Sequence, residues 1–483
     1  MFDLRPVGYV LGLMVMVLGL TMLLPMLVDL AEGRGHWPVF AESAIVTGVT
    51  GLLVALACRN AIGQALTIRQ AFVLTTGTWA LLPAFGALPF MLGETQSHLV
   101  DAYFEAMSGV TTTGTTVLSG LGALPKGLLL WRGIMQWLGG LGIVIVALLF
   151  LPVMRVGGMQ FFRSEGFDTL GKVLPRSVDI AKGVLNVYLA LTLACTFAYL
   201  VLGMGAFDAT VHALTTVSTG GYSGTDQSFG AFPGAPQYAS VVFMILGTVP
   251  FVRLMQGMNG QFAAMLHDSQ LRAFLRWMVY AVALVTGYEV WRAGTLTEEV
   301  FRQRLFNVVS LFTGTGYGDG DVTQWGHMPF AILILVGAIG GCTGSTGCSI
   351  KIFRYQILLR AIGLQLRRIF SPNSVMPLRH EGRPVADEVL RSVMLLFTSY
   401  VLFFGLFSVG LELTGLTLIE SVTGAWTAIF NIGPAFGPSI GSAGDVAAFP
   451  AAAKWLMILA MLMGRLEVVA VIVLLVPAFW RRF

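Results

Sequence analysis

The residues with the most distinctive chemistry are 313–319, whose sequence is Thr-Gly-Thr-Gly-Tyr-Gly-Asp and which lie between two apolar segments. Selecting a monovalent cation requires removing its water, and a ring of backbone carbonyl oxygens can replace that water. Glycine supplies the unusual backbone angles that turn carbonyls toward an axis, and threonine adds a hydroxyl oxygen. Since one loop cannot surround an ion, the run predicts a filter only together with further loops.

Three further loops lie in the same position, after a short helical run and before a second apolar span. They centre on Gly114, Gly220 and Gly433, and with Gly316 they are 106, 96 and 117 residues apart. Glycine is also frequent in membrane helices generally, but repetition at one interval indicates four equivalent units. The carbonyls expected to coordinate the ion belong to Thr112, Thr113, Gly114, Ser218, Thr219, Gly220, Gly314, Thr315, Gly316, Asn431, Ile432 and Gly433.

Two further features of these loops affect the ion. The C-terminal end of each short helix carries partial negative charge and is expected to point at the pore centre. The fourth loop has Asn431, Ile432 and Pro434 in place of threonines. An asymmetric ring is expected to form fewer well-shaped ion sites than four identical loops.

The amino-acid composition is typical of a membrane protein. Of 483 residues 56% are hydrophobic and 11% are charged, whereas soluble domains carry about 25% charged residues. The net charge of +4 is too small to indicate nucleic-acid binding. The four cysteines form no metal-ligand pattern with histidine, and a disulfide framework is not expected in so apolar a chain. The first apolar span is expected to be an uncleaved helix, because no small-residue cleavage site stands out after it.

These observations predict an all-α polytopic membrane protein. A pair of transmembrane helices occupies residues 1–62, and four pore units follow at 63–156, 157–267, 268–385 and 386–483. Each unit has a span, a short re-entrant helix, a filter loop and a second span. The short helices are expected near 99–108, from 207, near 299–312 and near 418–430. The second spans are expected near 128–154, 238–266, from 328, and near 452–480.

Lys and Arg predict that both termini are cytoplasmic, because basic residues concentrate in cytoplasmic loops. The residues assigned to that side are Arg59, Arg69, Arg155, Arg163, Lys172, Arg176, Lys182, Arg272, Arg276, Arg354, Arg360, Arg367, Arg368, Arg379, Arg383, Arg481 and Arg482. Those assigned to the opposite side are Arg34, Lys126, Arg132, Arg292, Arg302, Arg304 and Lys454. The acids Asp226, Glu298, Glu299, Asp319, Asp321 and Asp445 then lie outside, where they either attract cations to the mouth or belong to ordinary solvated loops.

The second span of the third unit contains five glycines within residues 337–349. Each glycine disfavours a helix by about 1 kcal/mol, and irregular backbone at membrane depth is tolerated where it lines a water-filled cavity. We expect an intramembrane gate, although a helix packed closely through small residues is the alternative. The gate residues are Gly340, Gly341, Cys342, Thr343, Gly344, Ser345, Thr346, Gly347 and Arg465. Arg465 is a charge in an apolar span, which indicates function unless it pairs with Glu467. Arg253 receives no role.

The chain resembles the Trk/Ktr/HKT superfamily of cation transporters, and most closely its Trk potassium-uptake membrane subunits. The resemblance covers nearly the whole chain and rests on the filters, on Gln-Trp-Leu-Gly-Gly-Leu-Gly at 136–142, Gly-Gly-Met-Gln at 157–160, residues 340–347, and Gly-Arg-Leu-Glu at 464–467. It implies four pseudo-fourfold units around one pore, K⁺ as the transported ion, an Arg465 that faces the pore, and a homodimer in the bacterial inner membrane. It also implies a cytoplasmic regulatory ring of the TrkA type, so that no nucleotide site lies on this chain.

Three classes of function were compared. The first is a potassium-uptake subunit whose pore is gated by the cytoplasmic partner. The second is an H⁺- or Na⁺-coupled symporter, which requires acids in the spans, and Glu105, Glu289 and Glu467 are its candidates. The third is an enzyme, which we do not expect because no Walker A sequence, His-Glu-x-x-His motif or nucleophile–base group is found.

Overall fold

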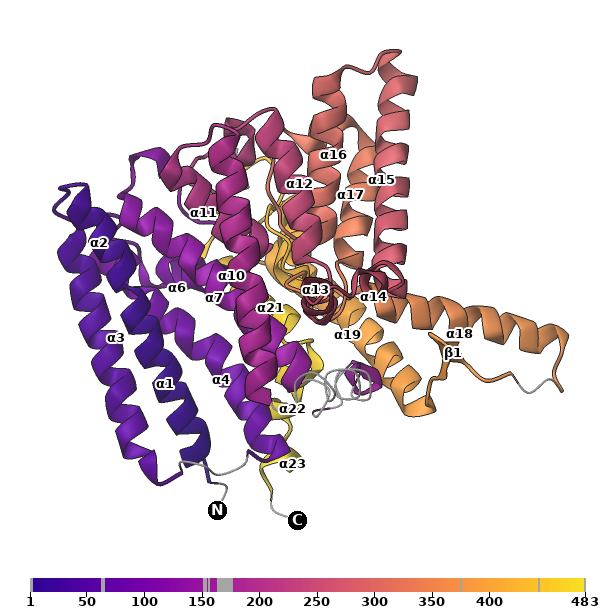
Figure 1. Cartoon of the computed structure of the whole chain (residues 1–483), viewed down its shortest axis with the longest axis horizontal. Helices are drawn as coiled ribbons and strands as arrows, with labels where there is room; N and C mark the ends of the chain where they lie inside the picture. The colour runs from indigo at the N-terminus through magenta and orange to yellow at the C-terminus, as the bar shows by residue number, and fades with distance from the viewer. Residues whose placement is uncertain are drawn as a thin grey trace.

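The computed structural model describes residues 3–61, 66–150, 154, 157–162, 177–373, 376–441 and 444–481. Helices make up nearly all of its regular structure (Figure 1). In these residues seven helical segments are long and apolar enough to cross a membrane, and two sharply bent helix pairs would bring the number to nine. The chain is therefore a multi-pass membrane protein built from helices, as its composition predicts.

The first three helices form a hairpin at one side of the molecule (Figure 1, left). They are α1 (Arg5–Thr21), α2 (Leu23–Ala31) and α3 (Trp37–Ala57). α1 and α3 approach closely because glycines remove side chains between them. A Cβ added to Gly12 would lie 2.6 Å from the backbone nitrogen of Ala55, and one added to Gly51 would collide with Met16. Small residues at such contacts are typical of membrane helices.

Four units follow, each with a long helix, a short helix, a loop and a further helix. Unit one contains α4 (Ile68–Gly86), α5 (Leu88–Leu92), α6 (Leu99–Val110) and α7 (Lys126–Leu149), and unit two contains α10 (Ser177–Val201), α11 (Ala206–Val217) and α12 (Ala235–Gly247). Unit three contains α15 (Ser269–Ala293), α16 (Glu298–Thr313) and α17 (His327–Ile339), and unit four contains α19 (Asp387–Glu412), α20 (Leu418–Phe430) and α21 (Ala451–Arg465). The short helices α6, α11, α16 and α20 have 12, 12, 16 and 13 residues. A span needs about 20, so these four are re-entrant. The residue boundaries proposed for the units stay predictions.

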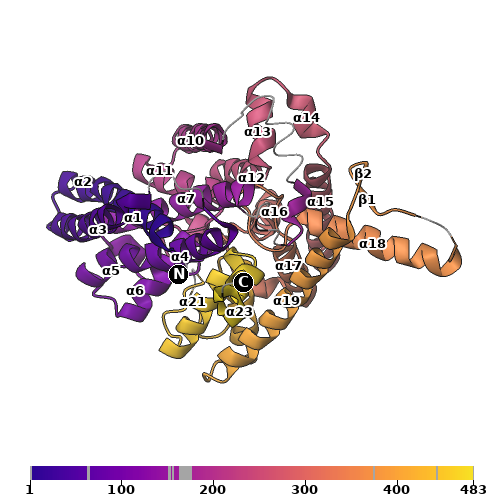
Figure 2. The ribbon, with the colours of Figure 1, turned by 90° about the horizontal axis from the view of Figure 1, so that it is seen from below.

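The remaining elements connect or extend the units. The helices are α13 (Phe251–Met258), α14 (Phe262–Leu266), α18 (Ile352–Phe370), α22 (Val469–Leu475) and α23 (Pro477–Trp480). The 3-10 turns are η1 (Arg59–Ala61), η2 (Leu121–Ala123), η3 (Met159–Phe162), η4 (Ser228–Ala231) and η5 (Val322–Trp325). A short hairpin joins β1 (Arg379–His380) to β2 (Arg383–Pro384), with Arg379 opposite Pro384 and His380 opposite Arg383. α18 projects away from the other helices (Figures 1 and 2).

The second spans of units two and four are broken, so the continuous helices predicted near 238–266 and 452–480 are wrong. α12 meets α13 at 103°, and α21 meets α22 at 111°. The first break precedes Pro250, which lacks a backbone N–H and disfavours helix in the residue before it. The second contains Glu467 and Val468, whose φ angles of 62° and 45° do not fit a right-handed helix. In unit three the predicted break is present, because α17 ends at Ile339 and residues 340–351 are irregular.

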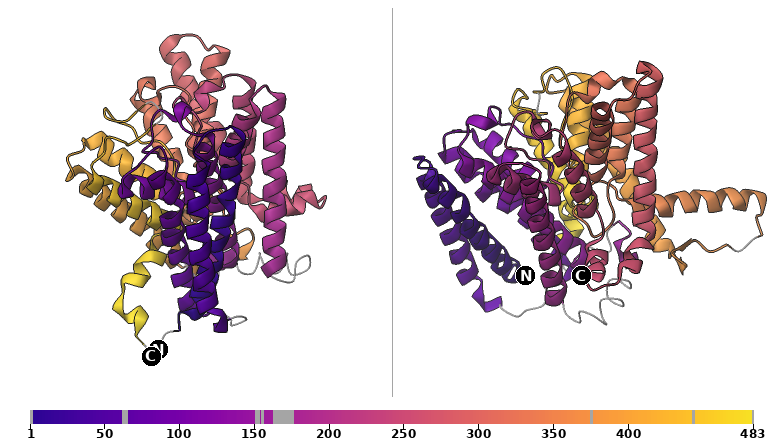
Figure 3. Two further views of the ribbon diagram at one scale, coloured as in Figure 1. Left: turned by 90° about the vertical axis from the view of Figure 1, so that its left-hand side faces the viewer. Right: turned by 45° about the horizontal axis from the view of Figure 1, so that its top comes forward.

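Both described ends of the chain lie at one end of the molecule, opposite the turn between α15 and α16 (Figures 1 and 3). This agrees with the expectation that both termini lie on the same side. Which side of the membrane that is stays a prediction. Of the basic residues used for it, Arg155, Arg163, Lys172, Arg176 and Arg482 lie outside the described residues.

Candidate functional site

The four short helices end in one shared backbone motif. A residue in the left-handed region follows each helix, with φ of 52°, 51°, 79° and 53° at Thr112, Thr219, Gly314 and Asn431. The next residue donates its N–H to the carbonyl five positions earlier, and these pairs are Thr113 to Ser108, Gly220 to Thr215, Thr315 to Ser310 and Ile432 to Thr427. A glycine with φ between 77° and 89° comes next, at Gly114, Gly221, Gly316 and Gly433. The internal repeat is therefore present in the backbone itself.

This motif corrects the register of the second loop. The sequence aligned Gly220 with Gly114, but the glycine with the matching left-handed angle is Gly221. Ser218 is the C-terminal cap of α11, as Thr111 is of α6. The second loop therefore contributes Thr219, Gly220 and Gly221 in place of Ser218, Thr219 and Gly220. Because Gly220 and Gly221 are adjacent, the sequence alone does not determine which of them is equivalent to Gly114.

Loops from distant parts of the chain meet at one point. A Cβ on Gly114 would collide with the carbonyl oxygen of Gly220 and lie 3.3 Å from the Cα of Gly433. A Cβ on Gly221 would collide with the carbonyl oxygen of Thr315, and one on Gly316 would lie 2.6 Å from the Cα of Gly433. Each loop therefore touches its two neighbours, and the ring closes in the order of the chain. Side chains at these glycines would enter a neighbouring backbone, so the close approach itself requires glycine.

Side chains hold two of the loop carbonyls in place. Nε2 of Gln136 on α7 donates to the carbonyl of Gly220 at 2.6 Å, while its Oε1 accepts the N–H of Tyr222 at 3.1 Å. The hydroxyl of Thr115 donates to the carbonyl of Gly433 at 2.6 Å. The hydroxyl of Thr427 also donates to the carbonyl of Gly433, so both lone pairs of that oxygen are used, whereas the carbonyl oxygen of Gly220 keeps one for a further partner. These bonds hold the orientations of the second and fourth loops.

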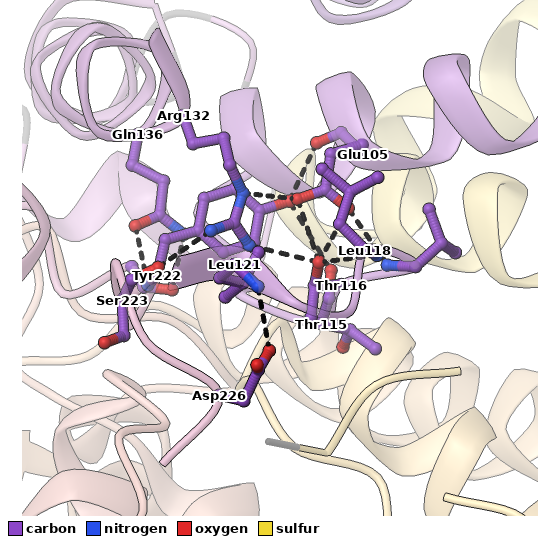
Figure 4. Close-up of polar contacts among 12 residues, drawn as sticks. Glu105, Thr115, Thr116, Leu118, Leu121, Arg132, Gln136, Tyr222, Ser223 and Asp226 are labelled. Carbon is purple, nitrogen blue, oxygen red and sulfur yellow. Dashed lines mark hydrogen bonds and ion pairs between the residues drawn. The ribbon is translucent and has the colours of Figure 1, made fainter. Parts of the chain in front are cut away.

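A buried ion pair joins the first two loops (Figure 4). Nε of Arg132 on α7 lies 2.7 Å from Oε1 of Glu105 on α6, and both side chains are at most 1% exposed. The same guanidinium donates to the carbonyl of Ser223 at 2.8 Å and to the hydroxyl of Thr116 at 3.0 Å, and stacks 4.0 Å from the ring centre of Tyr222. Arg132 is thus a buried brace, and its assignment to the loops of the outer side is wrong.

The third loop is braced by its tyrosine. The hydroxyl of Tyr317 lies 3.1 Å from the hydroxyl of Thr216 and donates to the carbonyl of His212 at 3.1 Å, both on α11. Ser310 on α16 donates to the carbonyl of Tyr317 at 2.8 Å. Tyr317 therefore links the second and third loops, as Arg132 links the first and second.

A cavity of about 790 Å³ opens above the third and fourth loops. Gly316, Asp319, Asp321 and Pro434 are among the residues that line it. Although burial acts to raise it, hydrogen bonds from Thr323 and Gln324 lower the pKa of Asp321, so its carboxylate stays ionised at neutral pH. Of the six outer acids predicted to surround a mouth, these two aspartates line this cavity. Glu298 instead forms an ion pair with Arg302.

The glycine-rich segment lies directly beside the loops. Residues 340–351 form no helix, so the alternative of a closely packed helix is wrong. Sγ of Cys348 lies 3.6 Å from the hydroxyl of Thr112, and a Cβ on Gly314 would lie 3.3 Å from the Cβ of Cys348. The hydroxyl of Thr346 donates to the carbonyls of Val217 and Gly247 at 3.1 and 2.8 Å. The segment is thus anchored to unit two and contacts loops one and three.

Arg465 lies at the sharp bend that ends α21, and it is 5% exposed. Its Nη1 lies 2.8 Å from Sγ of Cys348, while Nε and Nη2 have no hydrogen-bond partner among the described residues. Glu467 forms its ion pair with Arg354 on α18. The alternative pair of Arg465 with Glu467 is therefore wrong. Cys348, Arg465 and Glu467 line a cavity of about 20 Å³ beside the glycine-rich segment, which we call the inner cavity.

Comparison with known proteins identifies the family. A family model described as a cation transport protein, TrkH, matches residues 36–482. The chain belongs to the TrkH family.

Relatives of the TrkH family match over the full length. The chain is 39% identical to the Trk system potassium uptake protein TrkI of Halomonas elongata, over 99% of this chain and 97% of the relative. It is 32% identical to the Trk system potassium uptake protein TrkH of Escherichia coli K12, over 99% of both chains. The crystal structure of the potassium transporter TrkH from Vibrio parahaemolyticus is 30% identical and aligns over 99% of this chain and 100% of its own, with a TM-score of 0.91. The names describe transport and not a catalysed reaction.

The three acids considered as proton carriers each have an arginine partner in this TrkH-family chain. Glu105 is bound by Arg132, and Oε2 of Glu289 lies 2.8 Å from Nη2 of Arg304. Glu467 is bound by Arg354. Each carboxylate therefore has a structural role in holding two elements together. Arg253, which received no role, binds Asp268 at 2.9 Å.

In the described part of the chain, no group of three or more His, Cys, Asp or Glu residues could hold a metal ion. The four cysteines are free, and all but Cys58 are buried.

Sequence reasoning missed Gly221, Gln136, Arg132 and Lys351, which lines the inner cavity. A signal existed for two of them: Gln136 lies in a motif used for the resemblance, and Arg132 and Glu105 are charges inside apolar segments of adjacent helices. Lys351 is the last residue of the irregular segment 340–351, and no motif in the sequence distinguishes it.

Proposed function

We propose that this chain is the potassium-uptake membrane subunit of a Trk system. The observation that carries the proposal is the ring of four loops, in which Gly114, Gly221, Gly316 and Gly433 bring four backbones into contact. Full-length relatives named as Trk potassium uptake proteins support the choice of ion.

The filter would use backbone carbonyls of the four triplets to replace the hydration shell of K⁺. With the register of the second loop corrected, the coordinating set is Thr112, Thr113, Gly114, Thr219, Gly220, Gly221, Gly314, Thr315, Gly316, Asn431, Ile432 and Gly433. Partial negative charge at the C-terminal ends of α6, α11, α16 and α20 adds attraction for a cation. Braces through Arg132, Gln136 and Tyr317 support a fixed filter geometry.

The gate would consist of residues 340–347 and Arg465. Contact of Cys348 with Thr112 and Gly314 supports a position at the exit of the filter. Arg465 bonds to Cys348, and its Nε and Nη2 have no hydrogen-bond partner among the described residues. A guanidinium in the ion path repels a passing cation by about 3 kcal/mol at roughly 6 Å and an effective dielectric of 20.

The system would include a cytoplasmic nucleotide-binding ring of the TrkA type that controls this gate. The name Trk system, carried by the relatives, supports a complex of several components. The membrane subunit would be a homodimer in the bacterial inner membrane, with both termini cytoplasmic. Ends that lie together (Figure 3) and the excess of Lys and Arg on that side support this orientation.

A coupled H⁺ or Na⁺ symporter is the alternative. Its three candidate acids are all held by arginines, which argues against carboxylates that release and bind a proton in each cycle. Purified protein in liposomes separates the two functions. We expect K⁺ flux down its own gradient that is unchanged by an opposing pH or Na⁺ gradient and that increases with the ring partner and its nucleotide. Flux that stops when the H⁺ or Na⁺ gradient is removed would show a symporter, and no K⁺ flux under any condition would overturn the proposal.

A further inference from the structure

Lys351 is a buried lysine that lines the inner cavity. It is 8% exposed, and its Nζ has no hydrogen bond among the residues that the structure describes. Its φ of 77° is left-handed, which is unfavourable for a residue with a Cβ. Lysine is almost never fully buried unless it is paired. Strain at a single non-glycine residue persists where the surrounding structure over-determines it, often at functional sites.

The backbone around Lys351 explains how the strain is maintained. Its N–H donates to the carbonyl of Ile339 at 2.9 Å, and the N–H of Ile352 donates to the carbonyl of Gly341 at 3.2 Å. These bonds close the irregular segment on itself where α17 ends and α18 begins. The side chain of Lys351 is thereby directed into the inner cavity, which it lines.

The inner cavity contains more positive than negative charge. Lys351, Arg465 and Glu467 line it, and the carboxylate of Glu467 is already bound by Arg354. The described lining residues therefore carry a net charge of +1, and with Arg354, which neutralises Glu467, the group has an excess of two positive charges. The cavity of about 20 Å³ has room for about one water molecule, so little solvent is present to screen them.

We propose that Lys351 is a second cationic barrier residue, which acts with Arg465 to oppose a cation that leaves the filter while the pore is closed. This rests on the proposed function of the ring of loops as a cation pathway. The two charges come from different units, Lys351 from the third and Arg465 from the fourth. An opening that moves α18 relative to α21 separates the charges and admits water, which screens both.

The test measures K⁺ flux of the full chain in liposomes without partner, with the same pH on both sides. Lys351→Met keeps the length of the side chain and removes its charge, and we expect flux to increase at least about threefold. Lys351→Arg keeps the charge and is expected to stay near the wild-type flux. Lys182→Met is the matched control, because Lys182 is an exposed lysine on α10 and its loss should change nothing.

A fourth variant separates charge from packing. Arg354, Arg465, Glu467 and Cys348 interact electrostatically with Lys351, and all four remain in every variant. In Lys351→His the added imidazole is charged at pH 5.5 and neutral at pH 7.5, so flux should increase with pH more steeply than in Lys351→Met. Such a slope supports the barrier even if Lys351→Met proves unstable.

Three results would overturn the inference. They are a folded Lys351→Met protein with flux at or below wild type, a Lys351→Arg protein as leaky as Lys351→Met, and a histidine variant whose flux follows the pH profile of Lys351→Met. The proposed function is judged separately, by wild-type flux against protein-free liposomes. If the wild type conducts K⁺ and the variants give any of these three overturning results, only the role of Lys351 fails. If the wild type never conducts K⁺, the proposed function and the role of Lys351 both fail.

Discussion

A Cβ at Gly316 would lie 2.6 Å from the Cα of Gly433, and its φ of 81° is left-handed. Two residues later, a Cβ at Gly318 would meet nothing within 4 Å, and Gly318 has no such angle. Steric contact and backbone angle therefore require glycine at position 316, whereas neither requires it at position 318. At the scale of single residues, close contact with the fourth loop requires glycine at 316 and not at 318.

This difference gives a controlled prediction for selectivity. Gly316→Ser should reduce the preference for K⁺ over Na⁺ by about fivefold to tenfold, because about 1 kcal/mol of strain is placed on contacting loops. Gly318→Ser should leave the preference unchanged. Relative K⁺ and Na⁺ fluxes in liposomes measure both. Equal ratios in the two variants would remove Gly316 from the filter.

Arg465 allows a second prediction at this scale. Arg465→Ala should increase K⁺ flux, because a repulsion of about 3 kcal/mol at roughly 6 Å is removed, and Arg465→Lys should keep flux low. Glu467→Gln should act differently, since Glu467 binds Arg354 and removing one partner of a buried pair costs about 3–5 kcal/mol. Flux assays and the yield of folded protein distinguish the two. Similar loss of folded protein in Arg465→Ala and Glu467→Gln would contradict the barrier role of Arg465.

At the scale of elements, the glycine-rich segment is a loop whose two ends meet. The ideal Cβ position of Gly347 lies 3.3 Å from the Cα of Gly341, so the residues between them form a closed excursion. Its anchors are the hydroxyl of Thr346 and the N–H of Cys342, which donates to the carbonyl of Thr248 at 3.2 Å. Removing the excursion therefore leaves α17 and α18 joined with little change in their positions.

Deletion of residues 341–346 should increase K⁺ flux in the absence of the partner. The reason is that Thr346 within the excursion bonds to the carbonyl of Val217 at the end of α11, and that the ends of the excursion can be joined across the gap. Thr346→Val is a milder variant, which removes the two hydroxyl bonds to unit two and should give a smaller increase. Flux in liposomes measures both. A deletion protein that is folded but conducts no more than wild type would mean that the segment is not a gate.

The elements also show what the sequence could predict. Hydrophobic spans and local periodicity predicted the four short helices, and the glycines predicted the break after α17. The bend after α21 could not be predicted, because Glu467 is held by Arg354, 113 residues earlier in the chain. The register of the second loop depends on which of Gly220 and Gly221 meets Thr315 of another unit. Contacts between residues far apart in the sequence determine both the bend after α21 and the register of the second loop. Composition and spacing contain no information about such contacts.

At the scale of the whole molecule, α7 connects the N-terminal hairpin to the ring of four loops. Oδ1 of Asp29 on α2 accepts the N–H of Gly127 in the first turn of α7 at 2.6 Å, where a carboxylate is favoured by the helix dipole. Its Oδ2 lies 2.8 Å from Nδ1 of His36, and both side chains are at most 1% exposed. Farther along the same helix, Arg132 and Gln136 brace loops one and two. The hairpin thus holds the helix that braces the first and second loops.

Asp29→Asn tests this connection. The amide can replace one acceptor but loses the charge that His36 and the helix terminus favour, so unfolding free energy should fall by about 1–3 kcal/mol. Glu42→Gln is the matched control, because Glu42 is an exposed acid on α3 and its neutralisation removes no buried contact. Thermal unfolding in detergent should show a lower midpoint for Asp29→Asn only. If α7 transmits the effect, K⁺ over Na⁺ preference should fall as well, since Gln136 holds the carbonyl of Gly220. A lower midpoint with unchanged preference would limit the hairpin to stability, and an unchanged midpoint would show that the buried carboxylate does not hold α7.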